Sequence, residues 1–552
     1  MKQIDAIDLG IMWDRLTAIT DEVLISLVRT AFSVGVREAW DAACVIFDAR
    51  GRSIGQATLS MPAFIGTAPF TMQHMLAKFP AEQWAPGDIV VTNDPWLGTG
   101  HTPDLCVARP VFQNDVLMGF IMTISHLPDI GGVGLSAHNT ESYHEGLVLP
   151  VCKLYHAGEP DPALHDLIGA NVRGADTVFG DILANVSGCA VGERLVRELM
   201  NEYELDDLQG LADGIIEQSE AAIRARIETI PDGIYKNALE IETVGDTTEI
   251  ACTVTVEGDH IDIDFTGSGP SVPFAINVPL CYARAFSAYT IKCLTTPTIP
   301  NNEGATLPIN VHAPEGCILN AVKPSPTGAR HSVGWFIVPL IMGALAEAIP
   351  DRVQADAGMA SLFLVDAGSA GEAAPVLYFL AGGLGAMAGL DGHHTTPAPT
   401  NNAVVASEIW EDETGMTVTR RQLLTDSGGP GEFRGGLGQV AEMINSTDHA
   451  KTIFMFGMRT EFPAKGYLGG GNGTVRRFEV DGEVVPAKGK LVLAPGQTLS
   501  VHEAGGGGYG DPARRNPQSV LADVEKGAVS VKAALADYGV TVDLARGTAV
   551  RD

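Results

Sequence analysis

The sequence predicts a multi-domain α+β protein, with mixed sheets and helices in its N-terminal region and a β-rich, glycine-rich C-terminal region. With 552 residues, the chain exceeds what one compact core supports, and about three domains are expected. Long stretches with apolar residues at helical spacing are separated by short apolar or alternating runs bounded by turn residues. We expect a metal-bearing α/β region at 1–230, a hairpin-and-helix region at 231–322, and a β-rich region with terminal helices at 323–552.

The composition is that of an ordered globular protein with an acidic surface. Hydrophobic residues make up 45% of the chain and charged residues 19%, and 67 acidic against 36 basic residues give a formal net charge of -31. Nucleic acids and anionic membranes favour clustered Lys and Arg, so this balance argues against both as partners. Ordinary solubility explains the charge better than an acidic docking face does.

We expect a cytoplasmic chain that does not enter a membrane. The eight cysteines include no Cys-x-x-Cys pair and stand mostly among apolar neighbours, which indicates reduced, buried thiols. The N-terminus lacks the apolar core of a signal peptide. The longest apolar run, at 333–346, is too short to span a bilayer and contains Pro339.

Hydrophobic spacing predicts the N-terminal elements. Residues 11–32 form an amphipathic helix, because apolar side chains recur on one face and aspartates lie on the other. Residues 42–47 form a buried strand, which a tight turn returns through 53–56 as a hairpin. Helical patterns follow at 162–200 and 205–230, and they close the first region.

A repeated motif lies where two buried strands are expected to end. The apolar runs 88–91 and 118–124 predict strands, and each precedes a His-x-x-Asp motif, at 101–104 and at 126–129. Two such ends side by side would bring imidazoles and carboxylates together, and these are the ligands of a catalytic divalent metal. A turn in which Asp caps backbone amides is the alternative for either copy alone. The doubling, with glycines beside both copies, leaves both interpretations open.

The middle region is expected to contain a β-hairpin and a buried helix. Residues 249–256 and 260–265 alternate apolar and polar side chains about a short turn. The alternation places Asp262 and Asp264 on an outward face, and the spacing of a calcium-binding EF-hand is absent, so solvated carboxylates explain them better. Residues 280–294 predict a buried helix.

The C-terminal region combines an apolar helix with glycine clusters. Residues 330–349 predict one helix kinked at Pro339. The clusters at 428–436 and 505–510 predict tight β-turns, where only glycine readily tolerates a positive φ, and a phosphate cradle is the weaker alternative. Residues 382–389 lack both the Lys-Ser/Thr ending and the G-x-G-x-x-G pattern of nucleotide-binding loops. The chain therefore shows no recognisable ATP site.

The motif region also carries a family resemblance. Asn-Asp-Pro-Trp-Leu-Gly at 93–98, His-Thr-Pro-Asp at 101–104 and His-x-x-Asp-Ile-Gly-Gly at 126–132 resemble the B-subunit signature of the hydantoinase B/oxoprolinase family. This family includes the beta subunits of ATP-dependent hydantoinases and lactamases and the related acetone and acetophenone carboxylase subunits. The resemblance covers nearly the whole chain, because other segments are similar to further signatures of the family: 143–146, 264–267, 302–304, 426–438 and 505–512.

The resemblance extends the candidate metal site to four ligands. In the family, an Asp that precedes a small-Cys strand contributes to the metal site, and Asp41 occupies the matching position. The implied ligands are Asp41, His101, Asp104 and His126. Two imidazoles with carboxylates suit one divalent zinc, manganese or iron ion.

Two further carboxylates are candidates for catalytic roles. Asp129 could accept the second ring N–H of a liganding His and fix its tautomer, or it could act as a general base. Glu145 lies in a turn-rich stretch of the kind that lines pockets. It could transfer protons or contact substrate, and a carboxylate that only closes a loop is the alternative.

The resemblance implies a reaction shared between two subunits. In the family, ATP belongs to a separate A subunit, which phosphorylates an amide or enol oxygen before the activated species meets the metal centre of the B subunit. We expect this chain to work in a hetero-oligomer with such an A-type subunit, and to open a cyclic amide such as a hydantoin, oxoproline or lactam.

The sequence leaves two alternatives open. The family pattern Thr-His-Leu-Pro-Asp is Gly-His-Thr-Pro-Asp here, at 100–104, and Arg-His-Ser-Val-Gly-Trp at 330–335 replaces a more glycine-rich segment. These departures keep a subunit of an acetone- or acetophenone-type ketone carboxylase as an alternative. The other alternative is a non-catalytic scaffold subunit, which would bind no metal.

Overall fold

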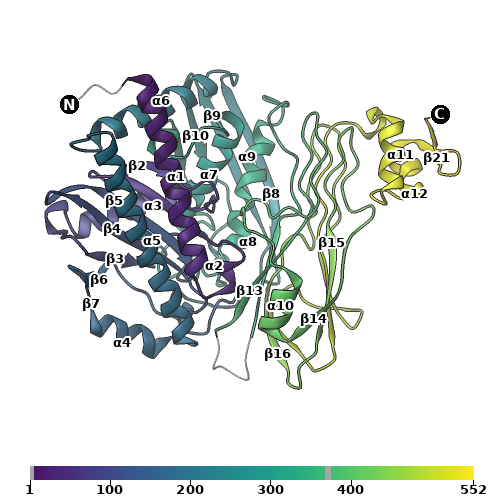
Figure 1. The fold of residues 1–552 in the computed structure, drawn as a ribbon. Helices are drawn as coiled ribbons and strands as arrows, with labels where there is room; N and C mark the ends of the chain where they lie inside the picture. Colours follow the sequence, from purple (N-terminus) through teal and green to yellow (C-terminus); the bar gives the residue numbers. More distant parts are fainter. Residues whose placement is uncertain (1–4, 367–373, 552) are drawn as a thin grey trace.

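The protein is an α+β molecule in which helices cover several separate sheets (Figure 1). The computed structural model describes residues 5–366 and 374–551. The described strands form a seven-stranded sheet, two four-stranded sheets, one five-stranded sheet and a two-stranded ribbon. The predicted fold class is confirmed. Within the described ranges, no helix combines the length and the apolar character that crossing a bilayer requires.

The N-terminal sheet is antiparallel and buried on both faces. Its order is β2-β1-β5-β4-β3-β6-β7. Alternate residues of β1 enter two different hydrophobic clusters, with Val45 and Phe47 on one face and Cys44 and Ile46 on the other. This explains the continuous apolar run seen in the sequence. The strands are β1 (Ala42–Asp48), β2 (Ser53–Gln56), β3 (Ile89–Thr92), β4 (Asp104–Gln113), β5 (Val116–His126), β6 (Cys152–His156) and β7 (Glu159–Pro160).

Two long helices, α1 and α5, pack side by side over one face of this sheet (Figure 1). The predicted amphipathic stripe of α1 is buried at Leu16, Val23 and Leu27. The side chain of Asp5 caps α1 by accepting the N–H groups of the first turn. The helices of this part are α1 (Ala6–Thr30), α2 (Val34–Arg37), α3 (Phe64–Lys78), α4 (Pro162–Asn171), α5 (Ala175–Glu202) and α6 (Gln209–Ile227).

The second sheet has the order β11-β10-β9-β8, and helices α7 and α9 contact it. Strands β9 and β10 form the predicted hairpin, and the predicted buried helix is α7. The elements are β8 (Gly233–Glu242), β9 (Thr247–Glu257), β10 (His260–Asp264), β11 (Ile309–His312), α7 (Leu280–Thr295), α8 (His331–Gly334) and α9 (Ile337–Leu345).

The prediction of one helix at 330–349, kinked at Pro339, is wrong. The chain forms two helices there, and the break falls between α8 and α9, before the proline. Pro339 lies in the first turn of α9. A helix needs no backbone N–H donor at that place, so the proline is tolerated without a kink.

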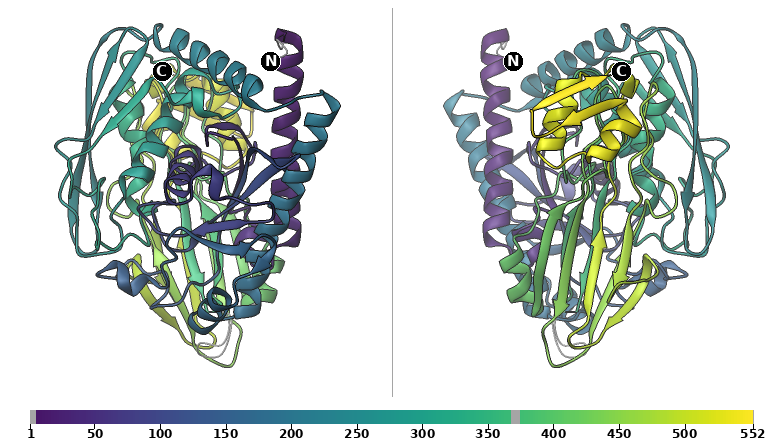
Figure 2. Two further views of the ribbon diagram at one scale, coloured as in Figure 1. Left: turned by 90° about the vertical axis from the view of Figure 1, so that its left-hand side faces the viewer. Right: turned by 90° about the vertical axis from the view of Figure 1, so that its right-hand side faces the viewer.

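The C-terminal half contains two further sheets, with orders β13-β12-β16-β19 and β14-β15-β20-β17-β18. Helices α11 and α12 lie at the periphery with the β21–β22 ribbon, drawn in yellow in Figure 2. The strands are β12 (Ala360–Val365), β13 (Val376–Ala381), β14 (Met416–Leu423), β15 (Gln439–Asn445), β16 (Lys451–Phe456), β17 (Arg477–Val480), β18 (Glu483–Val484), β19 (Lys488–Leu493), β20 (Thr498–His502), β21 (Val540–Asp543) and β22 (Thr548–Arg551). The helices are α10 (Ser407–Thr414), α11 (Pro517–Glu525) and α12 (Val531–Tyr538).

The predicted reason for the C-terminal glycine clusters is wrong at most positions. Gly510 does have a positive φ, of 71°. Gly505 does not, and a Cβ atom placed on it would lie 1.7 Å from the carbonyl oxygen of Ser427. A Cβ on Gly383 would lie 1.9 Å from the carbonyl oxygen of Gly436. These glycines let backbone segments pack directly against one another, and few of them serve tight turns.

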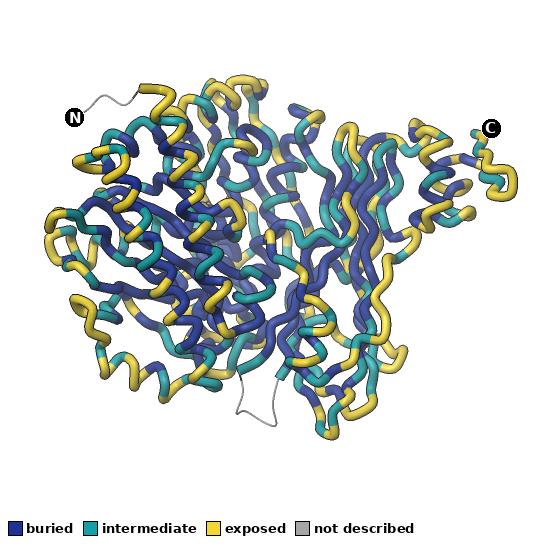
Figure 3. The backbone as a smooth tube through the Cα atoms, in the orientation of Figure 1, coloured by how far each residue is buried: buried dark blue, intermediate teal, exposed yellow. Residues whose placement is uncertain are grey.

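Burial is continuous through the body of the molecule (Figure 3). One hydrophobic cluster includes residues from all three predicted regions, such as Phe47, Ile250 and Phe363. The boundaries at 230 and 322 therefore stay a prediction.

Candidate metal centre

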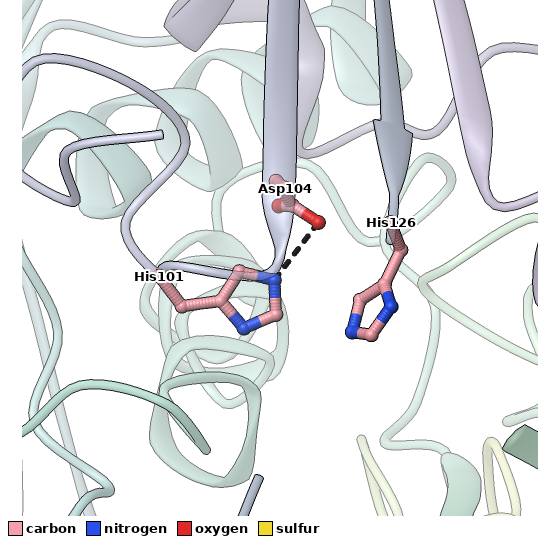
Figure 4. A group of neighbouring side chains, drawn as sticks. All are labelled: His101, Asp104 and His126. Atoms are coloured by element: carbon pink, nitrogen blue, oxygen red, sulfur yellow. Dashed lines mark ion pairs between the residues drawn. The ribbon is translucent and has the colours of Figure 1, made fainter. Parts of the chain in front are cut away.

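The ends of two neighbouring strands bring three potential metal ligands together (Figure 4). Asp104 begins β4 and His126 ends β5, and the antiparallel register pairs these two residues directly. His101 reaches the same place from the turn before β4. Each of the three offers one donor atom, and these atoms lie within 4.8 Å of one another. All three side chains are buried.

The hydrogen bonds of His101 define which of its ring nitrogens is free. Its Nδ1 lies 2.8 Å from the carbonyl oxygen of Gly328, which can only accept, so Nδ1 carries the proton. Burial, and then the charge of Arg330, lower the pKa of His101, so the ring is neutral near pH 7. Its Nε2 therefore presents a lone pair. That atom is buried and has no hydrogen-bond partner among the described residues.

This lone pair faces a carboxylate. Nε2 of His101 lies 2.9 Å from Oδ1 of Asp104. Burial acts to raise the pKa of Asp104, but the neighbouring His101 ring and the charge of Arg330 together hold that pKa below its ordinary value. Two acceptors facing each other at this distance repel, and a cation beside both removes the repulsion. The donor set therefore fits a divalent metal.

His126 completes the set as a second neutral imidazole. Burial, and then the proximity of His101, lower the pKa of His126 to about 4. The centroids of the two rings are 5.2 Å apart. A neutral ring near pH 7 keeps a nitrogen lone pair available for coordination.

Asp41 lines the same small cavity but does not belong to the converging group of three. It precedes β1, and its carbonyl oxygen accepts the His126 N–H at 3.2 Å. Burial, and then the charge of Asp104, raise the pKa of Asp41 to about 8. Its role as the fourth ligand stays a prediction.

Arg330 is an important residue of the site for which the sequence predicted no role. Its NH2 group lies 2.8 Å from Oδ2 of Asp104, and its Nε donates to the carbonyl of Thr99. The hydroxyl of Thr99 donates to the same carboxylate oxygen at 2.6 Å. The guanidinium also lies over the ring of Tyr282, 4.2 Å from its centroid. The position of Arg330, a charged residue at the start of an otherwise apolar stretch, was the feature of the sequence that could have indicated this role.

His331, next along the chain, also lines the cavity, and the sequence predicted no role for it either. It is buried, and its Nε2 has no partner among the residues that the structure describes. Burial lowers the pKa of His331 well below its ordinary value, and the nearby Arg330 lowers it further.

The carboxylate of Asp129 is held by Arg173. It accepts from the Arg173 guanidinium, and from the backbone N–H groups of Arg173 and Gly131 at 2.7 and 3.1 Å. In the described chain, its hydrogen bonds reach neither His101 nor His126. Its predicted role beside a liganding histidine stays a prediction.

Glu145 supports the site through the loop that contacts His101. Its Oε1 accepts the backbone N–H groups of Thr327 and Gly328 at 2.8 and 2.6 Å. Gly328 is the residue whose carbonyl holds Nδ1 of His101. Burial raises the pKa of Glu145 to about 7, although these backbone N–H groups act in the opposite direction. Glu145 therefore titrates near neutral pH.

The comparisons with known proteins identify the family. Residues 5–512 match Hydantoinase B/oxoprolinase, so this chain belongs to the hydantoinase B/oxoprolinase family, as the resemblance implied. Within it, the chain is 28% identical over 572 aligned residues to the putative D-/L-hydantoinase B subunit of Pseudomonas sp. (strain NS671), covering 98% of this chain and 96% of the relative.

Two solved structures share the fold. The crystal structure of the ATP-dependent caprolactamase from Pseudomonas jessenii matches with a TM-score of 0.89 and 28% identity, over 99% of this chain and 98% of that one. A nucleotide-free acetone carboxylase matches with a TM-score of 0.86 and 20% identity, over 98% and 81% of the two chains. The second likeness shows the fold alone.

Proposed function

We propose that this chain is the metal-containing B subunit of an ATP-dependent amidohydrolase, which opens a cyclic amide after a partner A-type subunit has phosphorylated it. The convergence of His101 Nε2 with donor atoms of Asp104 and His126 carries the proposal. Family membership supports the cyclic amide, because hydantoinases and caprolactamases are among the relatives. A hydantoin, an oxoproline or a lactam is the substrate class.

In this proposal, His101, Asp104 and His126 hold one divalent zinc, manganese or iron ion, with Asp41 as the fourth ligand. When bound, the ion supplies Lewis-acid chemistry, by polarising a carbonyl oxygen or lowering the pKa of water. Because the pKa of Asp41 is raised to about 8, its carboxyl group keeps a proton near pH 7 until a cation displaces it.

The surrounding residues orient these ligands. Arg330 and Thr99 hold Oδ2 of Asp104, which leaves Oδ1 toward His101. We assign proton transfer to Glu145, because a group with a pKa of about 7 can both accept and donate a proton near neutral pH. We assign Asp129 to holding the loop after His126 through its bonds to Arg173.

The partner is proposed to bind ATP, because the sequence contains no recognisable nucleotide-binding motif. The hydantoinase relative in Pseudomonas sp. is itself a B subunit. We therefore propose a hetero-oligomer in which activation takes place on the A-type subunit, and ring opening takes place beside His101 and His126.

Metal analysis of the purified chain tests the centre directly. We expect about one divalent ion per chain, and a loss of at least tenfold in metal affinity for His126→Gln, because one neutral nitrogen ligand is removed. His312→Gln is the matched control, because His312 is exposed on β11. A metal-free chain whose activity tolerates His126→Gln would instead support the scaffold alternative.

The reaction is tested in the complex with the A-type subunit. We expect ATP consumption to depend on a hydantoin or a lactam alone. ATP consumption that requires a ketone together with bicarbonate would assign the chain to carboxylation and overturn the hydrolase proposal.

A further inference from the structure

A set of cavities leads away from the metal centre. The cavity that contains His101 and His126 has a volume of about 40 Å³. Asn402 lines it and also lines a cavity of about 530 Å³. Trp335 likewise lines the small cavity and another of about 250 Å³, and the two larger cavities share Tyr289. The space beside the metal ligands therefore adjoins room for the rest of a small molecule.

Asn402 has a buried oxygen that lacks a hydrogen-bond donor. Its Nδ2 donates to the carbonyl oxygen of Ala39 at 3.2 Å. Because a carbonyl oxygen can only accept, this bond identifies the nitrogen and the oxygen of the Asn402 side-chain amide. Its Oδ1 is buried and finds no donor in residues 5–366 or 374–551, while the residue as a whole is 3% exposed. A buried acceptor without a donor is costly, which is why such an atom indicates a ligand.

The larger cavity offers a second acceptor of the same kind. Oδ1 of Asn301 is also buried, and no described residue donates to it. Asn301 and Asn402 both line the cavity of about 530 Å³. Amide oxygens need N–H or O–H donors, which cyclic amides and ureides supply and simple ketones do not.

We propose that Oδ1 of Asn402 accepts a hydrogen bond from the ring N–H of the cyclic amide, a hydrogen that the O-phosphorylated ring keeps while its nitrogen is protonated. The ring substituent then occupies the cavity of about 250 Å³ that Trp335 lines. This inference rests on the proposed function and deepens it. Asn402 is then a substrate-binding residue that favours amides over ketones, because a ketone would leave its oxygen unpaired.

The lining of the cavity of about 250 Å³ indicates that the substituent is apolar. Met342, Met359 and Met387 line it, together with Trp335. Two charged residues, Arg352 and Asp356, also line it, and Asp356 is paired with Arg459. Methionine side chains are flexible and polarisable, so they adapt to apolar groups of different shapes. We therefore expect an aliphatic or aromatic substituent in this cavity, rather than a second charged group.

Binding to the purified chain, measured with and without an added divalent metal, tests the role of Asn402 without any chemical step. The probes are δ-valerolactam and its N-methyl derivative, which lacks the N–H, and binding is measured by ligand-observed NMR titration. We expect the wild-type chain to prefer the N–H lactam by about tenfold, and Asn402→Ala to bind the two alike. Asn402→Asp keeps an acceptor oxygen and is expected to keep the preference.

An undiminished N–H preference in Asn402→Ala would overturn the inference. So would its loss in a folded Asn402→Asp chain, and this second variant decides the matter if Asn402→Ala does not fold. Neither result depends on the metal or on hydrolysis. If hydrolysis and metal binding fail while the N–H preference stands, only the proposed function is lost.

A substitution in the wall of the cavity of about 250 Å³ tests where the substituent lies. Met387→Trp fills part of the cavity of about 250 Å³. Because Met387 is only half-buried, the chain can accommodate the larger indole side chain. We expect Met387→Trp to weaken the binding of a phenyl-substituted lactam by about tenfold while leaving the unsubstituted lactam unchanged. Leu390→Trp is the matched control, because Leu390 is exposed nearby and does not line this cavity. Equal effects of Met387→Trp on both lactams would place the substituent elsewhere.

Discussion

The strand ends of β4 and β5 and the glycine-rich segments of the C-terminal half place opposite demands on the sequence. At the strand ends, buried polar side chains converge, and Nε2 of His101 comes within 2.9 Å of a carboxylate oxygen. In the C-terminal half, the absence of side chains lets backbones meet, as at Gly505. The first region requires particular functional groups, and the second requires that none be present. Substitutions should therefore fail for different reasons in the two regions.

The largest expected effect belongs to the glycine-rich region. Gly505→Ala places a Cβ 1.7 Å from the Ser427 carbonyl oxygen, and the three nearest atoms are all backbone, so no flexible side chain can move away. We expect the free energy of unfolding to fall by about 4 kcal/mol or more, or the chain to be insoluble. Urea denaturation measures this.

The control for Gly505→Ala is Gly10→Ala. Gly10 lies in α1, and a Cβ there would meet no atom within 4 Å. We expect an unchanged or slightly higher stability, by up to about 1 kcal/mol, because alanine favours a helix interior. Equal effects of the two substitutions would show that close backbone packing does not set the requirement for glycine.

The next effect belongs to the candidate metal centre, where a charge is removed. Arg330→Met leaves Asp104 without its buried guanidinium partner, since both side chains are no more than 5% exposed. Leaving one member of a buried pair uncompensated costs about 3–5 kcal/mol. Chemical denaturation with chelator present measures it. Arg546→Met serves as the control, because the side chain of Arg546 is 82% exposed, and no measurable change is expected. A stability equal to that of the wild-type chain would contradict a structural role for this ion pair.

Glu145 should make stability fall as pH rises. The pKa of an ordinary Glu is 4.5, and burial raises that of Glu145 to about 7 in the folded chain. Between these two values the folded chain binds more protons than the unfolded chain. The free energy of unfolding therefore decreases across this window and levels off above about pH 7.

Glu145→Gln has no proton to lose and should lack this decrease. Relative to pH 4.5, we expect the wild-type chain to lose about 3 kcal/mol more than the variant by pH 8. Denaturation at a series of pH values, with chelator present, measures the difference. Glu141→Gln, at an exposed position in the same loop, should follow the wild-type curve. Parallel curves for wild type and Glu145→Gln would show that Glu145 titrates normally.

The sequence predicted the fold class and a group of candidate ligands at the strand ends, because both depend on local patterns. The apolar runs 88–91 and 118–124 predicted β3 and β5, and the His-x-x-Asp spacing singled out His101, Asp104 and His126. The structure adds β4, which no run predicted and which Asp104 begins. Arg330 joins the site from more than 200 residues away in the chain, and Asn402 does so from farther still. Local spacing contains no information about such contacts, since tertiary packing alone creates them.

The glycine clusters show a different limit of sequence reasoning. A glycine signals either a positive φ or a close approach, and the sequence does not separate the two. Gly510 is a glycine because its φ is positive, and Gly505 is a glycine because backbone passes close to it. Only the position of the neighbouring backbone, here the Ser427 carbonyl, distinguishes them.

Gly510→Ala should have the smallest effect, and it separates these two reasons. At Gly510 the φ of 71° disfavours alanine, while the nearest atom to an added Cβ is a side-chain carbon of Glu432 at 3.1 Å. We expect a loss of about 1–2 kcal/mol in urea denaturation, the usual cost of a left-handed conformation. Gly510→Asn should recover part of this loss, because asparagine tolerates a positive φ. A loss as large as that of Gly505→Ala, with no recovery in Gly510→Asn, would mean that close packing rather than φ sets the requirement for glycine at this turn as well.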